Sequence, residues 1–317
     1  MLSRSAEGLY WMGRYLERAR HLSRLLQLQT EALVDRPVRE IYFGWSRIYN
    51  SVGRTPPGGS LEISDDDDFI LADSFTLADD LTFERSNPGS VWQCFWMGRE
   101  NARQMRNRIS GEMWTSLNLA YLRIQKEGIQ DIWSTSPQGF YAETIADINR
   151  FEGVAQTTMY RDDGWRFMQL GRAMERAQML VSLLLAHLSS ETPDREDSED
   201  DWTSLLRIYN AVDAYGQKHG VDVRAGRVLD LLVADPQLPS SLHRSVGRAA
   251  EELSGFGPPP DEGAGAAARR HAGRLGALVD YDWPDREDSV TFLQQVGGYC
   301  RTLHDLVAST YFHYQPG

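Results

Sequence analysis

The chain has 317 residues, 41% hydrophobic and 10% aromatic, which is enough apolar material for one large or two medium cores. Its net charge of −12 argues against a protein that binds nucleic acid or an anionic membrane surface, since both need clustered Lys and Arg. Two cysteines exclude a disulfide framework and a multi-cysteine zinc site. With neither a signal peptide nor an apolar run near 20 residues, we expect a cytoplasmic protein.

Apolar spacing predicts helices along the whole chain. In the first helix, apolar residues between Leu9 and Leu26 fall on one side. Ser90 is placed to cap a second helix that runs through Met105. No segment alternates strictly between apolar and polar residues, so we expect an all-α helical bundle. Further helices are predicted at 112–125, 141–149, 205–215, 242–253 and 291–312.

Three segments are predicted to be loops. Residues 55–59 are rich in Pro and Gly, and an acidic run follows at 65–68. Four adjacent aspartates favour a solvated loop over a magnesium site, because Mg²⁺ uses one or two carboxylates beside a bound phosphate. Residues 191–201 form a charged connector and residues 255–268 a low-complexity stretch, and we expect both to be mobile.

The chain also contains an internal repeat. Residues 9–19 and 167–177 share Gly, Arg, Glu, Arg and Ala in the same register, 158 residues apart. The letters R-I-Y-N then recur near positions 50 and 210, and an Asx-Pro turn leads to Gly-Arg in both halves. Three matches in one order indicate a tandem duplication. We therefore expect two pseudo-symmetric helical units, residues 1–157 and 158–317, packed as one globular protein.

The repeated element Gly-Arg-x-x-Glu-Arg-Ala supplies the first candidate site residues. In the first copy the charged residues project away from the apolar side, which predicts a solvated face. In the second copy their neighbours have become apolar, which predicts burial. Buried charges of this kind form either a polar network between helices or an anion pocket, and both remain open. The candidate catalytic residues are Glu17 and Glu175, and the candidate anion- or partner-binding residues are Arg14, Arg18, Arg172 and Arg176.

A related segment, W-M-G-R-E-N-A-R, adds Arg99, Asn101 and Arg103 as candidate anion- or partner-binding residues. Arg99, Arg103 and Arg106 share a helical face, which either binds a phosphate or carboxylate or pairs with the acidic loops. Phosphate-loop, dinucleotide, esterase and metalloprotease motifs are missing, and we expect no metal site. Cys300 and its neighbour His304 are expected to be packed in a helix rather than to form a catalytic dyad.

Four segments, at residues 1–19, 87–103, 110–118 and 158–177, form a familiar combination. Through them the chain resembles the Alpha-E family over nearly its whole length, and this resemblance implies an all-helical fold. It also implies a gene neighbourhood with circularly permuted ATP-grasp proteins and transglutaminase-like proteins. ATP-grasp enzymes activate a carboxylate as an acyl phosphate and join it to an amine, so the family is expected to serve amide or peptide formation.

Three functional readings follow. In the first, the chain is a helical partner subunit that docks on an ATP-grasp ligase and helps to shape its acceptor or anion site. In the second, it is itself an enzyme that acts on the activated acyl group or on the peptide product. In the third, it is a peptide-binding scaffold unrelated to ligation. We expect ATP and Mg²⁺ to be bound by the partner rather than by this chain alone, and enzyme activity stays uncertain.

Overall fold

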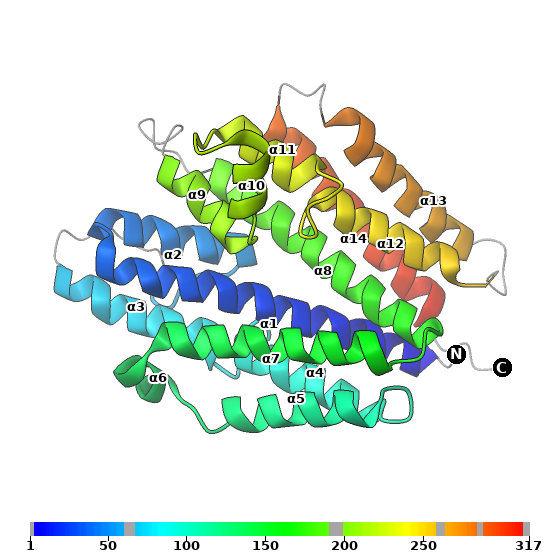
Figure 1. The fold of residues 1–317 in the computed structure, drawn as a ribbon. Helices are drawn as coiled ribbons and strands as arrows, with labels where there is room; N and C mark the ends of the chain where they lie inside the picture. Colours follow the sequence, from blue (N-terminus) through cyan, green and yellow to red (C-terminus); the bar gives the residue numbers. More distant parts are fainter. Residues whose placement is uncertain (1–2, 60–66, 190–198, 258–263, 284–287, 313–317) are drawn as a thin grey trace. The chain divides into compact units, whose positions relative to one another are not determined.

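The computed structural model describes residues 3–59, 67–189, 199–257, 264–283 and 288–312 (Figure 1). Within these ranges the chain forms fourteen α-helices and one π-helical turn, without any β-strand. The all-α prediction is therefore confirmed. None of the described helices combines the length and the apolar character that a membrane crossing requires.

The helices before residue 160 are α1 (Ser3–Asp35), α2 (Val38–Val52), α3 (Asp67–Thr82), α4 (Val91–Gln104), α5 (Gly111–Ile124), α6 (Ile129–Thr135) and α7 (Pro137–Thr158). The elements that follow are α8 (Asp163–Leu188), α9 (Glu199–Ile208), α10 (Val212–His219), α11 (Ala225–Ala234), α12 (Leu242–Gly255), α13 (Ala264–Ala277), η1 (Leu278–Asp282) and α14 (Ser289–Tyr311).

The chain divides into two compact units. The N-terminal unit comprises residues 8–168, and the C-terminal unit comprises residues 1–7 and 169–317. The boundary between Met168 and Gln169 lies inside α8, whereas the sequence repeat placed it after residue 157. The division into 1–157 and 158–317 stays a prediction about the duplication.

Apart from α10, which packs on α9 and α11 and has no counterpart in the N-terminal unit, each unit contains the same order of packed helices. In the N-terminal unit α2 packs on α3, α3 on α4, α4 on α5, and α5 on α7, while the short α6 contacts α3. In the C-terminal unit α9 packs on α11, α11 on α12, α12 on α13, and α13 on α14, while η1 contacts α11. Matching orders are what a duplicated unit would produce. Whether the two units superpose in shape stays a prediction.

The same capping chemistry begins α4 and α12. Ser90 accepts a hydrogen bond from the backbone N–H of the third residue of α4 (3.2 Å), and Ser241 does the same in α12 (3.1 Å). An Asx side chain shapes each preceding loop: Asn87 and Asp235 both accept the N–H two residues further on, at 3.0 and 2.7 Å. These contacts satisfy backbone donors that a helix start leaves unpaired. The prediction that Ser90 caps a helix is confirmed.

Two boundary predictions are wrong. The predicted helix 205–215 is interrupted, because α9 ends at Ile208 and α10 begins at Val212. Asn210 lies between them with φ 52°, a left-handed conformation that asparagine tolerates and a helix cannot continue. The helix predicted at 141–149 is the middle of the longer α7.

The predicted loops are shorter than expected, although 55–59 does form a turn region. Helices α3, α9 and α13 start inside the other loop segments, at Asp67, Glu199 and Ala264. Acidic residues in the first turn of α9 stabilise the positive end of that helix, and alanine, which recurs in the first turns of α13, has the highest helix propensity. The remaining parts of those segments, residues 65–66, 191–198 and 258–263, lie outside the described residues.

Candidate functional site

The Gly-Arg-x-x-Glu-Arg-Ala element of α1 is buried, which corrects the prediction of a solvated face. Only 1% of Glu17 is exposed, and this carboxylate forms an ion pair with Arg20. Arg14 is also buried, with its guanidinium carbon 4.9 Å from the centroid of the Trp11 ring. Arg18 is half-buried. The element therefore carries a buried carboxylate in the first copy as well as in the second.

The reason for this error lies in one aromatic residue. Tyr10 precedes Arg14 by four residues and Glu17 by seven, so all three share one face of α1. Tyr10 is completely buried, and its hydroxyl accepts a hydrogen bond from Arg14 at 3.5 Å. Tyr10 lies opposite the apolar side that the spacing predicts, so it marks a second buried face of α1.

In α8, burial of the second copy is confirmed. Glu175 is 0% exposed, while Arg172 and Arg176 are half-buried. The Nη1 atom of Arg172 donates to the side-chain oxygen of Gln169 at 3.2 Å. Arg176 donates to the backbone oxygen of Pro239 at 3.3 Å, which ties α8 to the loop before α12. These contacts fit a polar network between helices, while a role in anion binding stays a prediction.

The third predicted cluster forms a surface feature of the N-terminal unit. On α4, positions 92, 96, 99 and 103 recur at spacings of four and three and so lie on one face. On α5, which packs on α4, positions 114, 118 and 121 do the same (Figure 1). We call the following set the arginine–aromatic row: Arg85, Trp92, Trp96, Arg99, Arg106, Trp114, Asn118 and Tyr121.

Arg99 lies at the centre of this row. Its Nε donates to the side-chain oxygen of Asn118 at 3.0 Å. Its guanidinium carbon lies 4.7 Å from the ring centroid of Tyr121 and 5.3 Å from that of Trp114. The nearest carboxylate oxygen, from Glu100, is 3.9 Å from Nη1. Aromatic rings and an amide, rather than a close carboxylate, therefore hold this guanidinium, and the Arg99 side chain is 22% exposed.

Contacts between arginine side chains and aromatic rings continue from Arg99 to both ends of the row. At one end the guanidinium carbon of Arg106 lies 5.0 Å from the centroid of the indole that also contacts Arg99. At the other, Arg85 lies 4.7 Å from the Trp92 ring. Trp92 is stacked on Trp96 at 6.5 Å between centroids and lies 6.4 Å from Tyr121. The row is therefore a continuous series of arginines and aromatic rings across α4, α5 and the turns on either side of α4.

The row carries positive charge in an acidic chain. Between residues 85 and 108 there are five arginines and one acidic residue, Glu100. Glu100 pairs with Arg103, and this hydrogen bond lowers the pKa of the glutamate and raises the pKa of the arginine. Among the ion pairs of the described residues, none involves Arg85 or Arg106. Those two cations are therefore not neutralised by a neighbouring carboxylate.

Asn101 is not part of this row. It lies two residues from Arg99, so it projects about 200° away around α4. Of the predicted cluster, the structure brings Arg99 and Arg106 together on the row, although Arg106 lies in the turn after α4. Arg103 lies on the same face of α4 as Arg99. The aromatic members were missed, because their contacts depend on how α5 packs on α4. Their regular spacing along each helix was the available signal.

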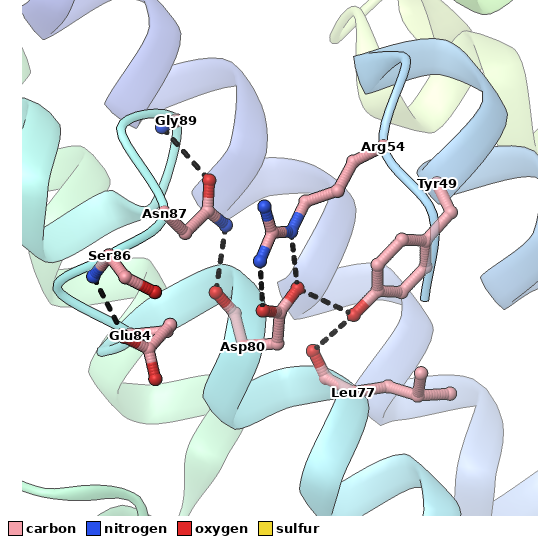
Figure 2. Close-up of polar contacts among 8 residues, drawn as sticks. All are labelled: Tyr49, Arg54, Leu77, Asp80, Glu84, Ser86, Asn87 and Gly89. Carbon is pink, nitrogen blue, oxygen red and sulfur yellow. Dashed lines mark hydrogen bonds and ion pairs between the residues drawn. The ribbon is translucent and has the colours of Figure 1, made fainter. Parts of the chain in front are cut away.

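A buried polar cluster fixes the chain just before α4 (Figure 2). Asp80 of α3 accepts hydrogen bonds from Tyr49 of α2 at 3.1 Å and from Arg54 at 2.8 and 2.6 Å. The side chain of Asn87 donates to the backbone oxygen of Asp80 at 2.8 Å. Burial, followed by the charge of Asp80, raises the pKa of Tyr49 far above its ordinary value. The cluster joins α2, α3 and the loop that positions α4.

The described residues also bear on metal and thiol chemistry. In this part of the chain no group of three or more His, Cys, Asp or Glu side chains is arranged to hold a metal ion. Cys94 and Cys300 are both buried and are not joined in a disulfide, so the prediction of a packed Cys300 is confirmed.

These features define a class of protein: an all-helical chain that carries Gly-Arg-x-x-Glu-Arg-Ala on two long helices. The sequence model of the Alpha-E family, described as a predicted alpha-helical domain with a conserved ER motif, matches residues 1–312. The chain belongs to this family. Glu-Arg dipeptides occur in it at 17–18, 84–85 and 175–176, and two of these lie in the repeated element.

Relatives among curated proteins are uncharacterised. One protein of Mycobacterium bovis and one of Mycobacterium tuberculosis are each 27% identical to this chain over 267 residues, and a second M. tuberculosis protein is 26% identical. Each match covers 77% of this chain but 29% of the relative, so the chain spans less than a third of the relatives' length. No solved structure matches the chain.

Proposed function

We propose that this chain is a helical partner subunit of an ATP-grasp-dependent amide- or peptide-forming system in the cytoplasm. In this proposal it docks on the ligase through the arginine–aromatic row. The ligase binds ATP and Mg²⁺ and carries out the chemistry, while this chain positions the ligase or helps to shape its acceptor site. The family resemblance supplies the identity of the partner, and the row supplies a surface for it.

The composition of the row is the observation that carries this proposal. Trp, Tyr and Arg are the residues most enriched among those that dominate binding energy at protein interfaces. Here three tryptophans and one tyrosine on the adjacent helices α4 and α5 gather with Arg99 of α4 and with Arg85 and Arg106 from the segments that flank α4. Leu119 and Leu122, on a neighbouring face of α5, are 62% and 40% exposed. Aromatic side chains, arginines and exposed leucines on adjoining faces are typical of a docking surface.

Co-purification with the ATP-grasp protein encoded beside this chain tests the proposal. We expect a stable complex that changes the rate of ATP turnover by the ligase, and no appreciable ATP hydrolysis by this chain alone. Leu122→Asp and Arg106→Gln should weaken the complex without unfolding the chain, because both side chains are exposed. Arg150→Gln is the matched control, since Arg150 is an exposed arginine on α7, outside the row.

Two results would contradict the proposal. Robust ATP turnover by the isolated chain would favour the enzyme reading instead. A complex that all three variants form equally well would show that docking, if it occurs, uses another surface.

A further inference from the structure

We propose that the arginine–aromatic row recognises an acidic segment of the partner's polypeptide, and that Arg99 anchors one of its carboxylates. This inference rests on the proposed docking function and specifies what the partner must present. The occupant is a short stretch of chain that carries Asp or Glu beside apolar side chains.

The environment of Arg99 prepares it for a carboxylate. Its Nε is occupied by Asn118, and two rings restrict the guanidinium plane. Within the described residues, neither Nη atom of Arg99 makes a hydrogen bond, since the nearest carboxylate oxygen is 3.9 Å away. A guanidinium with free N–H groups and a fixed plane can bind a carboxylate through two parallel hydrogen bonds. Because its orientation is already fixed, less conformational entropy is lost on binding.

Arg106 offers a second position for an acidic side chain. Its guanidinium carbon and that of Arg99 both lie within 5.3 Å of the centroid of the Trp114 ring. Arg106 is exposed and forms no ion pair in the described part of the chain. Two cations beside one indole can be reached by neighbouring acidic residues of a single short segment.

The charge distribution favours a short acidic segment over a long polyanion. Residues 85–108 carry a net charge of +4, and the whole chain carries −12. A nucleic acid would extend beyond the row and meet this negative surplus, which repels it. A peptide segment can stay within the row.

The apolar residues favour a peptide over a free phosphate. The half-buried indoles of Trp92 and Trp96 and the exposed Leu119 and Leu122 can contact apolar side chains, which phosphate lacks. Arginine binds phosphate and carboxylate with similar geometry, so the guanidinium groups alone do not separate the two. The apolar side chains beside the guanidinium groups favour the peptide, because a phosphate ion has no apolar group to contact them.

Titration of fluorescent peptides with the full chain tests this inference. The probe is a short peptide of Glu and Leu residues, and the comparison peptide has every Glu replaced by Lys. We expect measurable binding of the acidic peptide only, and an affinity that falls as salt screens the charges. Arg99→Gln and Arg99→Lys should each weaken binding about tenfold or more, because the lysine keeps the charge but cannot form the bidentate contact. Arg106→Gln should weaken binding less.

Controls keep a folding defect apart from a binding defect. Arg150→Gln should bind like the unsubstituted chain, and every variant should keep its circular dichroism spectrum and thermal midpoint. Equal binding of the acidic and basic peptides, or equal losses in Arg99→Gln and Arg150→Gln, would overturn the inference. A second acidic peptide, in which the leucines are absent, serves as a further comparison. If inorganic phosphate displaces both acidic peptides from the chain at the same concentration, the apolar contacts contribute nothing and the inference is also overturned.

The two proposals fail in different ways. If Arg99→Gln still co-purifies with the ligase while Leu122→Asp does not, docking stands and acidic recognition is wrong. If the acidic peptide binds through Arg99 and no ligase complex forms, acidic recognition stands and the proposed partner is wrong.

Discussion

Gly98 of α4 lies directly against Leu16 of α1. A Cβ atom added to Gly98 would be 3.0 Å from Cδ2 and 3.2 Å from Cγ of that leucine, which is closer than ordinary van der Waals contact. Both residues are buried. Glycine inside a helix is unfavourable by about 1 kcal/mol relative to alanine, so its use here reflects the close approach of the two helices.

Gly98→Val should therefore destabilise the N-terminal unit. Three added carbon atoms must displace Leu16 from a packed site, and overpacking of this kind typically costs about 1–3 kcal/mol. Gly153→Val on α7 is the control, because a Cβ there would meet nothing within 4 Å. Urea denaturation of both variants measures the difference. Equal stability of the two variants would mean that the contact between Gly98 and Leu16 is looser than described.

The buried cluster of Figure 2 predicts a larger loss at Asp80. Asp80→Ala removes the acceptor of Tyr49 and of both Arg54 hydrogen bonds. A buried donor left without a partner costs roughly 1–3 kcal/mol, and a charged one more, so we expect a loss of at least about 2 kcal/mol. Tyr49→Phe removes one hydrogen bond and should cost about 1 kcal/mol. Similar values for both variants in chemical denaturation would contradict a central role for Asp80.

The lowered pKa of Asp235 predicts a contribution to folding stability that is lost in acid. Burial alone would raise its pKa, but the ion pair with Lys218 and two backbone N–H groups outweigh burial, so the pKa is lowered. A carboxyl whose folded pKa lies below its unfolded value of about 3.9 stabilises the fold above that pH. The contribution disappears as the pH falls through the folded pKa. Asp235→Asn should therefore be less stable than the unsubstituted chain at pH 7, and the gap should close at lower pH.

The raised pKa of Asp79 predicts the opposite change of stability with pH. Burial, followed by the charges of Glu84 and Asp80, raises its pKa. The charged form is therefore disfavoured in the folded chain, and the penalty is present above the folded pKa and absent below about pH 3.9. Asp79→Asn should stabilise the chain at pH 7 and lose this advantage as the pH falls. Thermal denaturation across a range of pH measures the stability of Asp79→Asn and Asp235→Asn. If both variants were stabilised, or both destabilised, at pH 7, the opposite pKa shifts of the two aspartates would be contradicted.

Much of the fold could be predicted from local sequence signals. Ser90 and the apolar spacing located α4, and similar spacing located α5, α12 and α14. Gly and Pro in residues 255–268 predict a loop through the whole stretch, but its alanines already belong to α13, which starts at Ala264. The break between α9 and α10 was missed because Asn210 can adopt either a helical or a left-handed conformation. Sequence alone does not decide between these conformations.

The candidate site was predictable only in part. Helical spacing predicts Arg99, Arg103 and Arg106 on one face, and the structure supports this for Arg99 and Arg103. Because α4 ends at Gln104, Arg106 instead contacts the Trp114 ring from the turn that follows the helix. The rings that contact the arginines come from another helix, so they depend on a tertiary pairing that the spacing cannot reveal. Burial of Glu17 was missed for a similar reason, since a long helix can be covered on more than one side. Charge on a helix face does not by itself indicate solvent exposure.

Burial of both repeated glutamates changes what their substitution should do. On the solvated face that the sequence predicts, Glu17→Ala would cost less than about 1 kcal/mol, as the loss of an exposed ion pair does. Because Glu17 and Glu175 are 1% and 0% exposed, we now expect each alanine variant to lose roughly 3 kcal/mol, as when one partner of a buried ion pair is removed. Glu143→Ala is the control, because Glu143 is an exposed glutamate on α7.

Stabilisation by added phosphate or pyrophosphate then separates a structural network from an anion site. If Arg172 and Arg176 serve only the network, neither anion should raise the thermal midpoint of the chain. If they bind an anion, the midpoint should rise with anion concentration, and Arg172→Ala should abolish the rise. The contacts from Arg172 to Gln169 and from Arg176 to Pro239 favour the network, so we expect no rise. A rise that Arg172→Ala removes would contradict this expectation and identify α8 as part of an anion site.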